Sequence, residues 1–177
     1  MFDFLFNPSG RISRKGYAIG FFLPYFVLAM LPGFFLVQTG VMSIIMTIIG
    51  LFYFWPALIA VPFKRLHDLG YTGWLHILVI VAIGVLMIFA FSGMFMEIIQ
   101  DPEGDTATLL AQEGLSGWQM TAVFWGQVLT SAPQRIAFAL ATILQYGEMI
   151  AFLALAGKAG ENKYGQDPLV DGMGFAD

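Results

Sequence analysis

The sequence predicts an all-α, polytopic membrane helix bundle with four transmembrane helices and one interfacial helix on the outer face. Two observations carry this prediction. The chain is 58% hydrophobic and 11% charged, whereas soluble domains carry about 25% charged residues. Its charges also leave long gaps, since neither Gly16 to Phe63 nor Leu69 to Met96 contains an Asp, Glu, Lys or Arg. Soluble domains place charges on their outer faces, so these uncharged stretches belong in lipid.

Four stretches reach the length of about 20 apolar residues that a transmembrane helix needs. The first uncharged stretch is interrupted at residues 38–40 and therefore holds two spans, at about 18–37 and 41–61. We expect the third span at 74–96 and the fourth at 136–157. Prolines in the first two spans are tolerated because neighbouring helices can satisfy the freed carbonyl groups. The 177 residues are expected to form a single membrane domain.

An acidic loop at 97–117 and an uncharged segment at 118–132 separate the last two predicted spans. The loop contains five carboxylates and no Lys or Arg. The segment 118–132 is nearly long enough to span, and Pro133 is expected to break the chain after it. We predict that this segment lies on the outer leaflet as an interfacial helix. The alternative is a fifth span, which would move the basic tail at 158–177 to the outside.

The basic residues predict the orientation of the bundle. Seven of the eight Lys and Arg residues lie before the first span, in the 64–73 loop or after the fourth span. Cytoplasmic loops carry the excess of Lys and Arg, so both termini are expected in the cytoplasm and the acidic loop outside. The chain has no cysteine and a net charge of −4. The absence of cysteine excludes disulfides and thiolate ligands. The negative net charge gives no general attraction to nucleic acid.

Three polar segments flank the spans on the predicted cytoplasmic face. They read G-R-x-S-R-x-x-Y at 10–17, K-R-L-H-D-x-G-x-x-G-W at 64–74 and G-x-N-x-Y-G-x-D-P at 160–168. In this order they resemble the Domain of Unknown Function 805 family of small bacterial inner-membrane proteins. The resemblance covers the whole chain, with an apparent insertion between the third span and the tail. It implies a multi-span protein of the bacterial inner membrane and no particular activity, because the family's biochemistry is unassigned.

The three segments supply a candidate cytoplasmic cluster. Its members are Arg11, Arg14, Lys64, Arg65, His67, Asp68, Asn162, Tyr164 and Asp167. The segments leave the membrane on one face, so we expect an arginine of the first motif to reach Asp68 or Asp167, with Tyr164 packed nearby. The basic residues are expected to anchor the protein to anionic lipid head groups. A phosphate-containing ligand or a partner peptide is the alternative, which arginine would suit by bidentate contact.

Single residues of the cluster predict structure rather than chemistry. His67 and Asp68 are adjacent and would point about 100° apart on a helix, so they are not a catalytic dyad. We expect Asp68 to cap the third span or to neutralise an arginine, and His67 to lie at the interface. Asn162, Gly165 and Asp167 predict a turn. No ligand at helical-turn spacing accompanies His67 or His76, so no metal site is predicted.

Glu148 and Gln145 form a candidate intramembrane site on one face of the fourth span. A carboxyl group inside a span is costly and indicates a functional or structural role. One interpretation is a protonated Glu148 that joins helices by a hydrogen bond to a Gln, Ser or Tyr side chain. Proton or solute transport is the second interpretation. A shifted helix register that brings Glu148 nearer to water is the third.

No catalytic residue, cofactor site or metal site is predicted, and nucleic acid is not an expected partner. The function expected first is a non-enzymatic interaction, scaffold or regulatory protein. Its expected partners are anionic membrane lipids, together with another membrane protein or a second copy of the chain. A small proton- or ion-coupled transporter or channel that uses Glu148 is the alternative. A membrane enzyme acting on a lipid head group is the third.

Overall fold

The computed structural model describes residues 2–32, 40–101, 104, 118–119, 122 and 131–169. In this part of the chain all named elements are helices. Three are long and apolar enough to span a membrane, at Ile44–Asp68, Trp74–Gln100 and Ala132–Ala154, and Gly16–Met30 is a shorter apolar helix. The chain is therefore a multi-pass membrane protein by helix length and hydropathy.

The first apolar stretch follows a short helix, α1 (Phe2–Phe6), and turns more widely than an α-helix. It consists of η1 (Gly16–Phe22), α2 (Leu23–Tyr25) and η2 (Phe26–Met30). The N–H of Leu23 bonds to the Ala18 carbonyl, five residues back. Pro24 has no N–H to donate, and wide turns beside a proline let nearby carbonyls find other donors. Residues 33–37 of the predicted first span lie outside the described part of the chain.

The second apolar stretch continues further than the sequence predicted. It runs through α4 (Gly40–Trp55), η3 (Pro56–Ala60) and α5 (Val61–Asp68). The prediction of a loop at 64–73 was therefore wrong for residues 64–68, which remain helical because their side chains find partners in other segments. The helix ends where Gly70 takes a φ of +84° and its N–H bonds to the His67 carbonyl at 3.0 Å.

The last two long helices also differ from their predicted bounds. Helix α6 (Trp74–Gln100) continues past the predicted end at 96, whereas α9 (Ala132–Ala154) begins before 136 and ends before 157. Glu97 lies in α6 rather than in the loop. Helix α9 begins at Ala132, because the Ser131 hydroxyl accepts a bond from the Gln134 N–H while the Gln134 side chain accepts from the Ser131 N–H. Pro133 lies in this first turn, where a missing N–H is tolerated, and Ser131 before it has an extended backbone, so the helix is interrupted here as expected.

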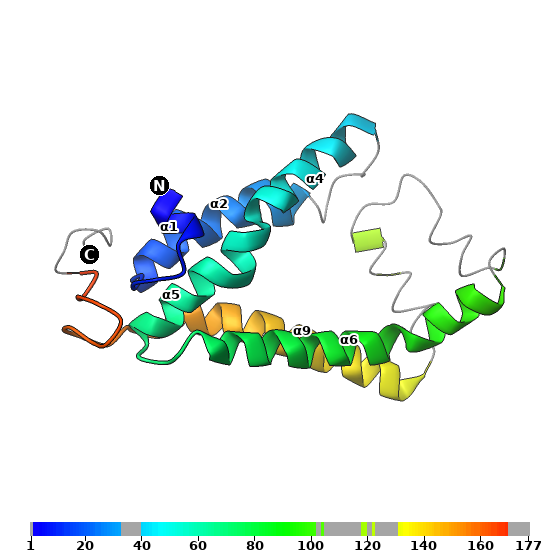
Figure 1. The fold of residues 1–177 in the computed structure, drawn as a ribbon. Coiled ribbons are helices and arrows are strands. Elements are labelled where there is room, and N and C mark those ends of the chain that lie inside the picture. Colours follow the sequence, from blue (N-terminus) through cyan, green and yellow to red (C-terminus); the bar gives the residue numbers. More distant parts are fainter. Residues whose placement is uncertain are drawn as a thin grey trace.

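The interfacial helix and the fifth-span alternative concern residues 118–132, and most of these lie outside the described part of the chain. Figure 1 shows α6 and α9 packed side by side along most of their length, whereas α4 diverges from them. Ala90 of α6 and Ala137 of α9 are buried between the paired helices. Small residues at such positions allow the two backbones to approach closely.

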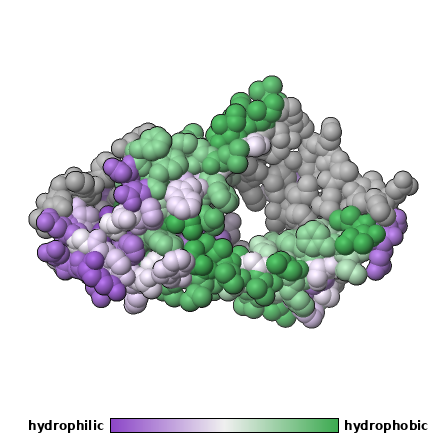
Figure 2. Space-filling view, in the orientation of Figure 1, coloured by the Kyte–Doolittle hydropathy of each residue, from purple (hydrophilic) through white to green (hydrophobic). Residues whose placement is uncertain are grey.

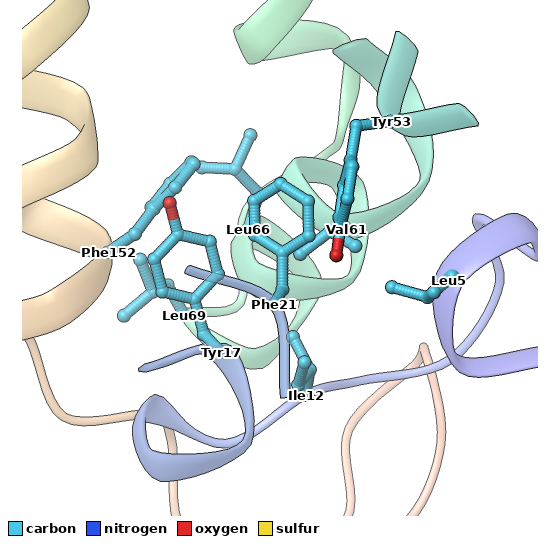
Figure 3. Packing of buried hydrophobic residues seen from close by; sticks show 9 residues of the cluster. All are labelled: Leu5, Ile12, Tyr17, Phe21, Tyr53, Val61, Leu66, Leu69 and Phe152. Carbon is cyan, nitrogen blue, oxygen red and sulfur yellow. The ribbon is translucent and has the colours of Figure 1, made fainter. Parts of the chain in front are cut away.

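The polar residues gather at one end of the molecule. Helix α1, the turn between α5 and α6 and the last described residues meet there (Figure 1), and the hydrophilic surface is concentrated around them (Figure 2). We call this the motif end, because it contains segments 10–17, 64–74 and 160–168. The larger hydrophobic core lies beside it (Figure 3). Its buried members are Leu5, Ile12, Tyr17, Phe21, Tyr53, Val61, Leu66, Leu69 and Phe152.

Candidate functional site

Asp68 joins the three motif segments. Its Oδ1 accepts bonds from Arg11 Nε at 3.2 Å and Arg11 Nη2 at 3.0 Å, while its Oδ2 accepts from Arg65 Nη1. Its backbone carbonyl accepts from the Lys158 N–H at 2.8 Å. The Asp68 side chain is 3% exposed and the Arg11 side chain 1%. The predicted contact between an arginine of the first motif and Asp68 is therefore present. We call Arg11, Arg65 and Asp68 the arginine clasp.

Arg65 is fully buried and connects α5 to the end of α9. Its guanidinium donates to the carbonyls of Phe152 at 2.9 Å, Leu155, and Ile12 at 3.4 Å. The last carbonyls of a helix have no partner within the helix and carry the negative end of its dipole. Arg65 therefore caps α9 with a positive charge. Arg14 adds a bond from Nη1 to the Ala154 carbonyl at 3.3 Å, and so caps α9 instead of pairing with an aspartate.

Arg11 binds backbone carbonyl groups in and beside the third motif. Its Nη1 donates to the carbonyls of Gly160 at 2.6 Å and Gly165 at 3.4 Å, and its Nη2 donates to the Lys158 carbonyl. One guanidinium thus holds the carboxylate of the second motif and the backbone of the third. Arginine suits this position because its five donors lie in a fixed plane.

The third motif folds as the predicted turn and packs on His67. Asn162 and Gly165 exchange backbone bonds at 3.1 and 3.0 Å, and Gly165 takes a φ of +131°. The Asn162 side chain accepts from the Tyr164 N–H at 2.8 Å and donates to the His67 carbonyl at 3.1 Å. The Tyr164 ring stacks on the His67 ring with centroids 3.9 Å apart. His67 also contacts the Gly10 carbonyl through Nδ1 at 3.1 Å.

Asp167 binds backbone N–H groups of the third motif and the residue after it, and it makes no direct hydrogen bond to an arginine among the described residues. Its Oδ1 accepts from the Leu169 N–H at 3.0 Å and its Oδ2 from the Gly160 N–H at 2.8 Å. These two backbone donors, Leu169 first, hold the pKa of this carboxyl below its usual value of 3.8, and Arg11 adds to the shift. Asp167 therefore stabilises the turn in its ionised form.

Lys64 and two glycines complete the packing around the arginine clasp. Lys64 is buried, and its Nζ donates to the carbonyls of Phe4 at 3.1 Å and Asp3, which ties α1 to α5. A side chain at Gly157 would overlap the Asp68 carboxylate, and one at Gly73 would overlap the Phe63 ring. These close approaches explain why the chain uses glycine at both positions.

The hydrogen bonds of the arginine clasp are satisfied, so it acts as a structural joint. The remaining basic residues of the motif end lie around it. A small cavity of about 150 Å³ borders the clasp, and Arg14, Lys15 and Lys158 are among its lining residues. Seven of the eight basic residues of the chain belong to the motif segments and the nearby tail.

Glu148 binds His76, a partner that the sequence reasoning missed. His76 Nδ1 lies 2.8 and 2.9 Å from the two carboxylate oxygens of Glu148. The two side chains are 7% and 14% exposed. His76 is the third residue of α6, and Glu148 lies six residues before the end of α9. The pair therefore lies near the ends of α6 and α9 that are close to the motif end, and not at the middle of either helix.

Gln145 does not bind Glu148 in the structure. It is exposed on α9 and lines two cavities together with His76. The larger has a volume of about 390 Å³ and also contains Tyr25 and Tyr53. The smaller, of about 90 Å³, includes Tyr17 and Glu148. The sequence suggests no partner for His76, which lies in an otherwise apolar helix start, and only the fold brings it to Glu148.

The comparison with protein families agrees with the motif pattern. The model of the family described as "Protein of unknown function (DUF805)" matches residues 5–101, more than half of the chain. The match contains the first two motifs, whereas the third motif lies beyond it and joins them in space. No curated protein and no solved structure matches the chain. The chain belongs to the DUF805 family of membrane proteins of unknown function.

Proposed function

We propose that this protein is a non-enzymatic interaction, scaffold or regulatory protein of the bacterial inner membrane. It spans the membrane four times with both termini in the cytoplasm, and the motif end holds a basic surface against the membrane. The observation that carries this proposal is the contrast at the motif end. The buried charges of the arginine clasp are bonded to one another and to backbone carbonyls, while Arg14 and Lys158 beside it are exposed.

Anionic lipid head groups are the partner that this surface fits best. Basic side chains at a membrane surface attract anionic lipids by about 1 kcal/mol each. Arg14, Lys15 and Lys158 border one cavity. Its two carboxylates already have partners, since Asp68 binds two arginines and Asp167 binds two backbone N–H groups. The cavity is small, so it suits a phosphate group better than a nucleotide. An acidic segment of a membrane-protein partner, or of a second copy of the chain, would use the same charges.

Thermal unfolding in nanodiscs tests this proposal. The wild type should be more stable when phosphatidylglycerol is added to phosphatidylcholine. The combined variant Arg14→Gln, Lys15→Gln and Lys158→Gln should lose this gain, and Arg135→Gln, which changes the basic residue in α9 at the opposite end, should keep it. Equal stability of the wild type in both lipids would contradict the proposal.

The orientation is tested by single cysteines in this cysteine-free chain. Ser9→Cys and Glu161→Cys report on the motif end, and Gln100→Cys reports on the far end of α6. With an impermeant maleimide in intact spheroplasts, only Gln100→Cys should react. Reaction of Glu161→Cys from the outside would overturn the proposed orientation.

A small proton- or ion-coupled transporter is the second candidate function. The contact between the side chains of His76 and Glu148 inside the bundle favours it, because ionisable side chains within membrane segments often mark ion pathways. Proteoliposomes that contain a pH-sensitive dye provide the test. Wild-type protein should dissipate a proton gradient and Glu148→Gln should not. Equal rates in the two samples would exclude this candidate.

A further inference from the structure

The cavity beside the arginine clasp lies in an excess of positive charge. Arg14, Lys15 and Lys158 line it, as do Asp68 and Asp167. The carboxylate of Asp68 is balanced by the two arginines of the clasp, and that of Asp167 is held by two backbone N–H groups. The basic side chains therefore outnumber the carboxylates that remain without an arginine partner. An anion with two negative charges is attracted more strongly to such a site than an anion with one.

Arg14 and Lys158 supply hydrogen-bond donors that the fold leaves available. Arg14 is exposed and uses Nη1 to bind the Ala154 carbonyl at 3.3 Å, so its other N–H groups have no acceptor within the described part of the chain. The exposed ammonium group of Lys158 has none among the same residues. Its side chain extends over Gly70, and it can turn toward the cavity without losing a hydrogen bond. A guanidinium group and an ammonium group bind phosphate oxygens by charge-assisted hydrogen bonds.

The size of the cavity restricts its ligand to a small group. Its volume of about 150 Å³ is below the roughly 300–1,000 Å³ of typical small-molecule sites, so it holds a phosphate group without a sugar or a nucleoside beside it. A phosphate monoester has three free oxygen atoms, a second pKa of about 6 and about two negative charges above that pH. A phosphodiester has one charge and one free oxygen fewer, and its second alcohol would have to lie outside the cavity. Charge and size therefore both favour a monoester.

The cavity lies where the apolar helices end at the motif end (Figure 1). Among its lining residues, Lys15 directly precedes η1, Asp68 is the last residue of α5 and Ala156 follows α9 by two residues. The head groups of a bilayer occupy the region just outside its apolar core. Leu155, next to Ala156, is 50% exposed, and Ile19, four residues after Lys15, is 47% exposed. An apolar surface thus begins directly at the cavity, which favours a lipid over a soluble phosphate.

We propose that this cavity binds the phosphate monoester head group of a glycerolipid, such as phosphatidic acid, in preference to phosphodiester head groups. This preference rests on the binding of anionic lipids proposed above, and it names their head group. Arg14 and Lys158 donate to the free phosphate oxygens, and Lys15 adds a third positive charge. The acyl chains leave along the apolar surface that begins at Ile19 and Leu155. The bound head group joins the first motif to the segment that follows α9.

Thermal unfolding in nanodiscs at two pH values tests this preference. Phosphatidic acid or phosphatidylglycerol replaces an increasing fraction of phosphatidylcholine, and the mole fraction that gives half of the maximal gain in the unfolding temperature is measured. At about pH 8, phosphatidic acid should need about one tenth of the mole fraction that phosphatidylglycerol needs, the effect of one additional charge-assisted hydrogen bond. At about pH 5 the monoester carries a single charge, so the two lipids should need equal mole fractions.

The outcomes separate this preference from general lipid binding and from the binding of a soluble phosphate. Equal mole fractions at about pH 8 would overturn the preference and leave the proposed binding of anionic lipids standing, whereas no gain with either lipid would contradict both. Glycerol 3-phosphate carries the same monoester without acyl chains. Added to nanodiscs of phosphatidylcholine alone, at the total concentration at which phosphatidic acid saturates, it should produce no gain. A gain equal to that of phosphatidic acid would assign the site to a soluble phosphate monoester and overturn the lipid assignment.

Variants test whether the residues of the cavity carry the preference. Arg14→Gln removes the guanidinium group, and the two anionic lipids should then need equal mole fractions at about pH 8. Arg14→Lys retains the charge but not the paired donors, and should keep part of the preference. Lys163→Gln changes an exposed basic residue at the same end that is not among the described residues lining the cavity, and should keep all of it. Because the two lipids are compared within each variant, a general loss of stability does not affect the ratio, and an unchanged preference in Arg14→Gln would contradict the proposal.

Discussion

The arginine clasp and the His76–Glu148 pair both bring ionisable side chains into an apolar bundle, but they differ in how they are satisfied. The clasp surrounds its charges with backbone carbonyls from three segments and with the carboxylate of Asp68. The His76–Glu148 pair satisfies one ring nitrogen and leaves the other buried without a partner among the described residues. The comparison teaches that the fold can satisfy a buried ionisable group completely, as in the clasp, or only in part, as at His76.

The largest effect should follow from breaking the clasp at its centre. Asp68→Asn removes the carboxylate that balances Arg11 and Arg65, and leaves two buried positive charges. Stranding a buried charge costs about 3–5 kcal/mol, so the variant should unfold at much lower temperature in lipid nanodiscs. Glu161→Gln changes an exposed carboxyl group at the same end and should alter stability by less than about 0.5 kcal/mol. Equal losses of stability in the two variants would show that the clasp does not contribute to the free energy of unfolding.

A substitution that crowds the clasp should have an intermediate effect. Gly157→Ala places a methyl group against the Asp68 carboxylate, and such overpacking costs about 1–3 kcal/mol. Gly147→Ala on α9 meets no atom within 4 Å and should stabilise the helix by about 0.5–1 kcal/mol. Chemical unfolding of the two alanine variants measures the difference. If Gly157→Ala were as stable as Gly147→Ala, the close approach to Asp68 would be excluded.

The His76–Glu148 pair should contribute less to stability than the clasp. Glu148→Gln keeps a side-chain oxygen beside His76 Nδ1 and replaces the carboxyl group by an amide. We expect a loss of about 1 kcal/mol, the value of one weakened hydrogen bond. Thermal unfolding in the same nanodiscs provides the comparison with Asp68→Asn. A loss from Glu148→Gln as large as that from Asp68→Asn would show that the pair stabilises the fold as strongly as the clasp does.

The smallest expected effect is a loss of stability at low pH that is confined to the turn of the third motif. The backbone donors of Leu169 and Gly160 lower the pKa of Asp167, so its ionised form is favoured in the folded turn. This stabilisation is complete above the ordinary value of 3.8 and is lost as the pH falls through the lowered pKa. Hydrogen exchange of the Gly160 amide should accelerate over this window relative to neighbouring amides. Asp167→Asn keeps an acceptor oxygen without titrating, and should remove the pH dependence.

The helices and the meeting of the motifs could be predicted from the sequence because both depend on simple patterns. Long uncharged runs indicate spans, and polar segments that leave the membrane on one face have to lie near one another. The contact of Arg11 with Asp68 followed from that argument. The helix ends were predicted less well. Ser131 and Gln134 cap α9 earlier than hydropathy suggests, and α5 continues to Asp68 because its polar side chains find partners outside the helix.

The His76–Glu148 contact could not be predicted in the same way. The two residues are far apart in the sequence and no motif connects them. Their approach depends on the register of α6 against α9, which is set by packing along the full length of both helices. The same limitation applies to the capping of α9 by Arg65, because sequence patterns show a basic residue near a helix but not which carbonyl groups it will bind.

A double-mutant cycle between Arg11 and Asp68 tests the central claim, that the three motifs are joined by one buried clasp. The free energy of unfolding is measured in lipid for Arg11→Gln, Asp68→Asn and the double variant. The account predicts a coupling well above about 1 kcal/mol. Removing Asp68 leaves buried Arg11 without its carboxylate, and removing Arg11 leaves the buried Asp68 carboxylate with Arg65 as its remaining ion-pair partner among the described residues. The double variant should therefore be much less destabilised than the sum of the single variants. Additivity within about 0.5 kcal/mol would contradict the claim.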